Sequence, residues 1–305
     1  MKDIILITGS TGLVATQLIK TLSINNEIWA ISSRVESIKK DYAKIDSVKC
    51  FSNEQLLNGD LDLSIVNTVI QCAYTRNNDP ALVSSASLFA SKVFGLALRA
   101  KVKKVINVST RSVYKEPKEG CLNKEEDPIY PNGAIGIGKY TIECMAEEMF
   151  KDSGISYTSI RLASVNEVKM KDVLPRPMNF FVDSMINGTP IKVISGKQVM
   201  SYIDPRDIAD AVSALLSIDS SLWKPIYNIG TGWMATATLL DIAKKIVKIG
   251  VEKYNLPEVN ISIEPREIDM RAGLDISKIT ADTGWTPKYG LDDMIVALYN
   301  MKLSK

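Results

Sequence analysis

The sequence contains no histidine, and its few cysteines form no metal-binding pattern. Cys50, Cys72, Cys121 and Cys144 are scattered, with no C-x-x-C pair among them. Without such a pair and without histidine, we expect neither a zinc site nor a disulfide scaffold. Histidine-based catalysis is excluded, so any proton transfer must use another group.

The chain also lacks long apolar runs and an excess of one charge. Runs such as Ile4 to Ile7 have the length of a strand, far below the roughly 20 residues of a membrane span. Lysine and arginine total 37 against 35 acidic residues, and the charges are interspersed, which indicates no basic surface for nucleic acid or lipid. The N-terminus shows no secretory signal. We therefore expect a cytoplasmic protein that binds small molecules, with no nucleic-acid or membrane partner.

The chain does have a large hydrophobic content, arranged in alternating segments. Its 305 residues, of which 46% are hydrophobic, can bury a large core in one domain or two lobes. Strand-like runs alternate with helical patterns, which is typical of βαβ units around a parallel sheet. Strands are predicted at residues 4–7, 28–31, 66–70, 102–108 and 156–162. Helical patterns lie near 14–22, 81–100, 139–152, 236–249 and 291–302.

These patterns predict an α/β fold, a Rossmann-type doubly wound parallel sheet with a smaller C-terminal substrate-binding lobe. Residues 1–165 would form the NAD(P)-binding domain, and segments near 188–229 would return to it. Residues 166–187 and 230–305 would form the substrate-binding lobe, whose start carries the proline-containing stretch Lys169 to Pro177. Such a lobe would cap the C-terminal edge of the sheet, where doubly wound folds bind ligands.

A glycine-rich turn follows the first predicted strand. Gly9 permits a tight turn, Gly12 lets the backbone approach a pyrophosphate, and the small Ala15 lets the helix pack close to the strand. The N-terminus of the helix would then face the phosphates. An ordinary βα turn is the alternative, although the position after the first strand favours a dinucleotide. The residues expected to bind the cofactor here are Gly9, Ser10, Thr11, Gly12, Leu13 and Val14.

The end of the second predicted strand bears on the choice of cofactor. Ser33 and Arg34 stand where an acidic residue would favour NAD. No carboxylate is present there to bind a ribose 2′-hydroxyl, whereas hydroxyls and a guanidinium can hold a 2′-phosphate. NADP is therefore the predicted cofactor, with NAD as the alternative. Arg34 could equally be a solvated surface residue.

Short motifs recur along nearly the whole chain, and their order is specific although each is weak alone. After the glycine turn they include Val69 to Ala73, Val108 to Tyr114, Glu126 to Pro128, Tyr202 with Asp207 to Ala209, Tyr227 to Gly232, and Gly284 to Pro287. The chain thus resembles the extended short-chain dehydrogenase/reductase family, the NAD(P)-dependent nucleotide-sugar epimerases, dehydratases and reductases. The resemblance implies a nucleotide-sugar bound by the second lobe, cofactor contacts at Cys72, Ala73 and Tyr74, and a diphosphate contact at Arg266. A surface ion pair is the alternative for Arg266.

Catalysis in this family uses a serine or threonine, a tyrosine and a lysine. The resemblance implies Thr110 as the hydroxyl residue that orients the substrate, with Ser109 as its near alternative. It implies Lys139 as the lysine that lowers the pKa of the tyrosine and binds the ribose. The tyrosine is missing, because Ile135 occupies its place. Isoleucine has no ionisable group, so the usual proton transfer cannot occur there.

Other tyrosines are candidates for the missing phenol. Tyr114 also lies four residues before a lysine, but a proline interrupts the helix that the motif requires. Tyr140 lies about 140° around the helix from position 135 and so faces elsewhere. Tyr130 or Tyr74 could reach the site from loops. The start of this helix also carries three glycines, each of which weakens it by about 1 kcal/mol relative to alanine. These are Gly133, Gly136 and Gly138.

The residues after the expected hydroxyl bear on the type of reaction. Arg111 and Ser112 stand where family dehydratases have an acidic pair, which disfavours dehydration. The resemblance then implies an NAD(P)-dependent epimerase or keto-sugar reductase with an unconventional acid. The alternative is a catalytically impaired protein that binds cofactor or nucleotide-sugar, or a partner subunit stabilised by its cofactor. The glycine turn and the retained hydroxyl and lysine favour the enzyme. The resemblance also implies a homodimer through the helices near 81–100 and 139–152, although the apolar faces of these helices could equally belong to the core.

Overall fold

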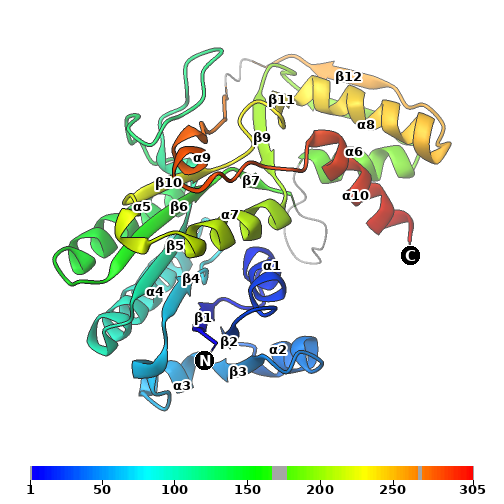
Figure 1. Cartoon of the computed structure of the whole chain (residues 1–305). Coiled ribbons are helices and arrows are strands. Elements are labelled where there is room, and N and C mark those ends of the chain that lie inside the picture. Colours follow the sequence, from blue (N-terminus) through cyan, green and yellow to red (C-terminus); the bar gives the residue numbers. More distant parts are fainter. Residues whose placement is uncertain (1, 167–176, 267–269, 305) are drawn as a thin grey trace.

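A seven-stranded parallel sheet forms the centre of the protein, in a computed structural model that describes residues 2–166, 177–266 and 270–304 (Figure 1). The strand order is β10-β6-β5-β4-β1-β2-β3. The chain adds β2 and β3 on one side of β1, and then crosses to the other side of β1 to add β4 and the strands beyond it. The strands are β1 (Ile4–Thr8), β2 (Glu27–Ser32), β3 (Val48–Ser52), β4 (Thr68–Gln71), β5 (Lys104–Thr110), β6 (Ser156–Leu162) and β10 (Ile226–Ile229). The predicted Rossmann-type sheet is confirmed, with its switch point beside β1.

Helices cover both faces of the sheet, because its strands bury side chains on both sides. Along β1, Ile5 and Ile7 pack into one core, whereas Leu6 packs into the other. Figure 1 shows α1 and α7 on one side and α4 and α5 on the opposite side. The first face carries α1 (Leu13–Leu22), α2 (Val35–Tyr42), α7 (Pro205–Ser217) and α9 (Ser277–Thr283). The second face carries α3 (Asn53–Asn58), α4 (Pro80–Ala100) and α5 (Gly133–Phe150).

A third core lies outside the main sheet. Buried side chains such as Phe181, Met200, Ile246 and Leu298 form it. Its elements are α6 (Pro177–Ile186), β8 (Ile191–Ile194), β9 (Val199–Ile203), β11 (Thr236–Thr238), α8 (Leu239–Tyr254), β12 (Ile261–Glu264) and α10 (Leu291–Leu303). In Figure 1 they gather beyond the end of the large sheet, and β9 also pairs with the short β7 (Ser164–Val165). The domain boundaries given above stay a prediction, and residues 169–176 of the proline-containing stretch lie outside the described residues.

The structure differs most from the predicted elements at the start of α5. We expect a helix from about 139, but it begins at Gly133 in spite of its three glycines. A close contact explains one of them, since a Cβ at Gly136 would lie 2.6 Å from the carbonyl oxygen of Ser112. The Asn78 side chain also accepts a hydrogen bond from the N–H of Ile135. Packing against neighbouring segments therefore outweighs the low helix propensity of glycine.

Helix α4 is long and apolar enough to cross a membrane, judged by length and composition. Only 28% of its most apolar window is buried, although Val93, Phe94 and Ala97 pack tightly beneath the sheet. A core helix of a soluble protein would meet the same two criteria, so this observation is weak evidence. The absence of a membrane partner stays a prediction.

Short 3₁₀ helices connect several of these elements. They span Leu63–Ile65, Arg111–Val113 and Ser220–Leu222. The second of them follows β5 directly, which extends to Thr110 because that residue still pairs with Leu162 of β6. The expected catalytic hydroxyl residues therefore lie at the C-terminal edge of the sheet, where the glycine turn also lies.

Candidate functional site

The glycine turn joins β1 to α1 at the C-terminal edge of the sheet. Gly9 has φ +68°, and a Cβ at this position would lie 2.7 Å from the Cα of Ala73. Only glycine meets both conditions, and the contact brings the end of β4 against the turn. Gly12 is the N-cap of α1, and no side chain caps this end. The first N–H groups of α1 are therefore available to bind an anion.

Ser10 holds the turn from within the protein. Its hydroxyl donates to the carbonyl oxygen of Ile7 at 2.8 Å, and its N–H donates to the carbonyl oxygen of Ile31 at 3.0 Å. The buried phenol of Tyr42 donates to the carbonyl oxygen of Ser10 at 2.9 Å. Tyr42 is not among the site residues predicted from the sequence, where its only signal is its place on the apolar face of α2. Ser10 and Tyr42 together fix the shape of the turn.

Thr8 connects the turn to β4. Its hydroxyl donates to Gln71 at 2.6 Å and accepts from the N–H groups of Cys72 and Ala73, both at 3.1 Å. These bonds hold the backbone of Cys72 and Ala73, two of the residues predicted to bind the cofactor, next to the turn. The signal for Thr8 was its position as the last residue of β1, which the sequence analysis did not use.

Arg34 lies over the glycine turn. Its Nη2 donates to the hydroxyl of Thr11 at 2.8 Å, and its N–H donates to the hydroxyl of Ser32 at 3.0 Å. Both Ser33 and Arg34 are exposed. The guanidinium therefore stands beside the helix terminus expected to bind phosphate, and its remaining N–H groups are free to bind an anion.

Lys139 lies at the ends of β4 and β5 and is 7% exposed. Its Nζ donates to the carbonyl oxygen of Val108 at 2.5 Å and lies 4.2 Å from the centre of the Tyr74 ring. Burial lowers the pKa of Lys139 to about 8, against the opposing effects of Cys72 and Glu143. Burial also raises the pKa of the Cys72 thiol to about 12, so this thiol stays neutral. The structure thus brings three predicted site residues, at 72, 74 and 139, into one cluster.

The two candidate hydroxyl residues differ in their surroundings. Ser109 is buried and donates to Glu143, which forms an ion pair with Arg161 at 2.7 Å. The side chains of this pair are only 4% and 2% exposed, so Ser109 is held in a closed interior network. Thr110 is half-buried, and its hydroxyl accepts from the N–H of Ser112 at 3.2 Å. Thr110 is therefore the more accessible of the two.

The tyrosines considered as substitutes do not gather around Lys139, apart from Tyr74. Tyr114 is buried, and its hydroxyl donates to Asn228 at 2.7 Å. Burial raises the pKa of Tyr114, which keeps it a neutral part of the core. Tyr130 is 72% exposed. Ile135 is half-buried on α5, so the chain has no phenol at the expected place.

Arg266 follows β12 and lies apart from the other predicted site residues. It pairs with Glu264 at 3.3 Å, and both side chains are more than half exposed. No contact recorded within residues 2–166, 177–266 and 270–304 joins Arg266 to the glycine turn or to Lys139. The surface ion pair considered in the sequence analysis is therefore present, and the diphosphate contact stays a prediction.

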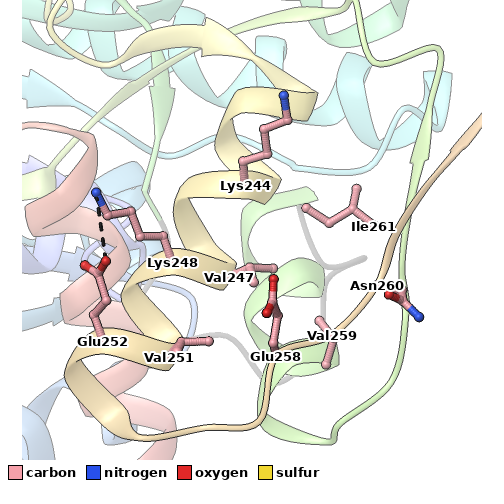
Figure 2. Close-up of a pocket in the computed structure, with 9 residues that line it drawn as sticks. All are labelled: Lys244, Val247, Lys248, Val251, Glu252, Glu258, Val259, Asn260 and Ile261. Atoms are coloured by element: carbon pink, nitrogen blue, oxygen red, sulfur yellow. Dashed lines mark ion pairs between the residues drawn. The ribbon is translucent and has the colours of Figure 1, made fainter.

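A surface groove on the second lobe contains none of the predicted site residues. It has a volume of about 420 Å³ and lies between α8 and residues 258–261. Figure 2 shows Lys248 and Glu252 as an ion pair along one edge of α8, with Val259 on the opposite wall. Within the part of the chain that the structure describes, no group of three or more cysteines or acidic residues could hold a metal ion.

Residues 5–230 match the NAD dependent epimerase/dehydratase family. The chain belongs to this family. A dTDP-glucose 4,6-dehydratase of an Actinoplanes species is 24% identical over 238 residues, which cover 75% of this chain and 71% of that protein. The UDP-glucose 4-epimerase of Lacticaseibacillus casei is 25% identical over 247 residues, covering 73% and 68% of the two chains.

Solved structures share the whole fold. The UDP-glucuronic acid 4-epimerase of Bacillus cereus, in complex with UDP-glucuronic acid and NAD, superposes with a TM-score of 0.82. The match covers 99% of this chain and 100% of that chain at 19% identity, so it shows the fold alone. Membership of this NAD-dependent family confirms two predictions: that the chain is an enzyme and that its cofactor is a nicotinamide dinucleotide. The preference for NADP over NAD stays a prediction.

Proposed function

We propose that this chain is a nucleotide-sugar epimerase or keto-sugar reductase that prefers NADP(H). The observation that carries the proposal is the cluster at the C-terminal edge of the sheet. There the uncapped N-terminus of α1, the Arg34 guanidinium and the Lys139 ammonium follow β1, β2 and β5. A dinucleotide carries its pyrophosphate between two riboses, and β1 likewise lies between β2 and β5 in the sheet. The family relatives named above act on nucleotide-sugars, which supports this substrate class.

The residues present fit the cofactor. The N–H groups at Leu13 and Val14 would bind the pyrophosphate, and Arg34 beside Thr11 would bind the 2′-phosphate. Lys139 would bind the other ribose. The bound nicotinamide supplies a hydride acceptor or donor for a carbon of the sugar. The close contact at Gly9 supports this arrangement, because any larger residue would push the turn away from β4.

Proton transfer must then use a group other than the missing tyrosine. An ordinary lysine stays protonated at neutral pH, but burial lowers the pKa of Lys139 to about 8. The neutral amine of Lys139 would accept the proton of the sugar hydroxyl as that carbon is oxidised. The ammonium would return the proton when the carbon is reduced. Thr110 would orient the same hydroxyl.

The surroundings favour epimerisation or reduction over dehydration. Dehydration needs an acid and a base next to the sugar, and Arg111 and Ser112 offer no carboxylate. Arg266 would contact the diphosphate of the substrate by exchanging its exposed partner Glu264. We also propose a homodimer through α4 and α5, whose outer faces include the exposed Leu88 and Ile137.

A second candidate function is cofactor binding without turnover. It is favoured by the burial of Lys139 against the Tyr74 ring together with isoleucine at position 135. In that case the bound dinucleotide would stabilise the chain or a partner complex.

Turnover of UDP-sugars with NAD or NADP separates the two candidates. The purified chain would be incubated with a panel of UDP-hexoses and keto-sugars, and products would be resolved by anion-exchange chromatography. We expect turnover that Lys139→Met abolishes and Thr110→Val weakens, whereas the exposed Lys151→Met is unchanged. Tight cofactor binding without any product would favour the second candidate. Absence of both binding and turnover would overturn both.

A further inference from the structure

Tyr74 and Gly138 fit together beneath the catalytic lysine. The Tyr74 ring lies under Lys139, whose Nζ is 4.2 Å from the ring centre. A Cβ at Gly138 would lie 2.1 Å from the hydroxyl oxygen of Tyr74 and 2.6 Å from a methyl group of Val83. Real Cβ atoms do not approach other atoms so closely. The Tyr74 hydroxyl, and with it the position of the ring, therefore depends on a space that exists only because residue 138 is glycine.

The same face of α5 carries the position of the missing phenol. Residues three and four apart on a helix are neighbours, so positions 135, 138 and 139 share one face. Side chains also lean toward the N-terminus of the helix, which directs the group at 138 toward position 135. A tyrosine at 135 would thus have stood beside Lys139. Here an aromatic ring reaches this face from the loop after β4.

We propose that Tyr74 is a positioning residue for Lys139, and that it supplies from the end of β4 the aromatic neighbour that this chain lacks at position 135. Gly138 is the residue that makes room for it. The inference deepens the proposed function and rests on it for the role of Lys139 in catalysis. The contact itself depends only on the described geometry.

Tyr74 acts through Lys139 and not as the acid itself. Its hydroxyl is buried between α4 and α5, and no hydrogen bond of good geometry reaches it among the described residues. Burial raises the pKa of Tyr74, while the nearby Ser87 hydroxyl lowers it. The phenol is therefore enclosed between α4 and α5. The face of its ring, in contrast, attracts the ammonium and excludes water from it.

Tyr74 affects the ionisation of Lys139 by keeping water away from its ammonium group. The other groups that face the ammonium are the Cys72 thiol after β4, the Val108 carbonyl on β5 and the Glu143 carboxylate on α5. Burial lowers the pKa of Lys139, whereas the Glu143 carboxylate, and Cys72 when ionised, raise it. Removing the ring would end its attraction for the ammonium, and that loss by itself lowers the pKa. The water admitted to this nearly buried ammonium would have the larger effect and move the pKa back toward the ordinary value for lysine.

The first experiment measures the titration of Lys139 without an activity assay. Trace acetylation with isotopic acetic anhydride across a pH series, read by mass spectrometry, reports the neutral fraction of each lysine. We expect Tyr74→Leu to raise the midpoint for Lys139 by about one pH unit, a tenfold change in the ratio of its two forms. Tyr74→Phe keeps the ring and should keep the midpoint. The exposed Lys151 is the internal control in every variant.

The second experiment approaches the same contact from Gly138. Gly138→Ala should displace the ring and shift the Lys139 midpoint in the same direction as Tyr74→Leu. The double variant Gly138→Ala with Tyr74→Phe removes the closer clash and should shift less. Gly95→Ala in α4 is the matched control, because its Cβ would meet only the tip of Arg99 at 3.5 Å. It should leave the midpoint unchanged.

The outcomes separate this inference from the proposed function. If Tyr74→Leu changes thermal stability but leaves the Lys139 midpoint and the cofactor affinity unchanged, Tyr74 only fills the core and the inference is wrong. A shifted midpoint in a chain that never turns over a sugar would support the inference and remove the proposed function. If Tyr74→Phe shifts the midpoint as far as Tyr74→Leu, the hydroxyl and not the ring is responsible, and the inference is also wrong.

Discussion

The C-terminal edge of the sheet, where we propose that the cofactor binds, has two halves that are built in different ways. We call the part around β1, α1 and β2 the turn half, and the part around β4, β5 and α5 the catalytic half. Around β1, α1 and β2 the geometry depends on backbone shape, with Gly9 against Ala73 and an uncapped helix terminus. Around β4, β5 and α5 it depends on charged side chains that are buried together, above all Lys139 and the pair of Glu143 with Arg161. The two halves meet where β1 pairs with β4 and where Thr8 and Gly9 contact the end of β4.

This difference explains how one half can change while the other persists. The loss of the phenol at position 135 alters only side-chain chemistry on α5. The glycine turn keeps its shape because Ser10 and Tyr42 hold it through bonds of its own. We therefore expect substitutions that impair proton transfer to leave dinucleotide binding intact, and the reverse. The following substitutions test the separation, in order of decreasing expected effect.

Restoring the phenol tests whether the catalytic half is otherwise intact. Ile135→Tyr would place a hydroxyl one helical turn before Lys139 on the same face. If no other group transfers the proton in the wild-type chain, turnover of a suitable nucleotide-sugar should rise by about 10²–10⁴-fold, which is the usual contribution of general acid–base catalysis. Steady-state kinetics would measure it, with Ile135→Phe as the control that adds a ring without a hydroxyl.

The opposite result would also be informative. If the wild-type chain turns over and Ile135→Tyr slows it while cofactor affinity is unchanged, another group already transfers the proton. That outcome would contradict the view that the catalytic half is incomplete. It would agree with the role proposed above for the Lys139 amine.

The buried ion pair should make the catalytic half sensitive to a single lost charge. Glu143→Gln leaves the Arg161 guanidinium buried without its counter-charge, and such changes cost about 3–5 kcal/mol of stability. Denaturant unfolding would measure the loss. Glu252→Gln is the control, since its pair with Lys248 is about two-thirds exposed and should contribute under about 1 kcal/mol. Equal losses of stability in the two variants would show that the buried ion pair contributes no more than the exposed one.

The glycine turn should respond to volume and not to charge. Gly9→Ala adds a strained φ, at roughly 1–2 kcal/mol, to a clash with the backbone of Ala73, at roughly 1–3 kcal/mol. Gly59→Ala is the matched control, because Gly59 also has positive φ but nothing lies within 4 Å of its Cβ. We expect Gly9→Ala alone to weaken dinucleotide binding, measured by calorimetry. If both variants bind normally, the contact of the turn with β4 does not shape the site.

The sequence predicts the turn half of the site better than the catalytic half. The strand Ile4 to Ile7 and the glycine turn were predictable because local periodicity and one short motif carry them. The start of α5 was not, since contacts with distant residues such as Ser112 outweigh the propensity of its glycines. The hydrogen bond of Ser109 to Glu143 in the buried network could not be predicted from the sequence either, because Glu143 lies on another element. Local signals thus predict the turn half well and the catalytic half poorly.

The smallest predicted effect concerns the phosphate selectivity of the turn half. Arg34 lies against Thr11 beside the N-terminus of α1, with N–H groups left to bind a 2′-phosphate. Losing one charge-assisted hydrogen bond costs about 1.5–3 kcal/mol, so Arg34→Ala should weaken NADP(H) binding by at least about tenfold. NAD(H) lacks that phosphate and should bind Arg34→Ala almost as well as it binds the wild type. Arg34→Lys keeps the charge but loses the paired donors, and an intermediate affinity is expected. Fluorescence titration with both cofactors would measure the ratio. The wild type could bind NAD(H) and NADP(H) with equal affinity, or Arg34→Ala could lower both affinities equally. Either result would show that Arg34 does not select the 2′-phosphate and only stabilises the turn.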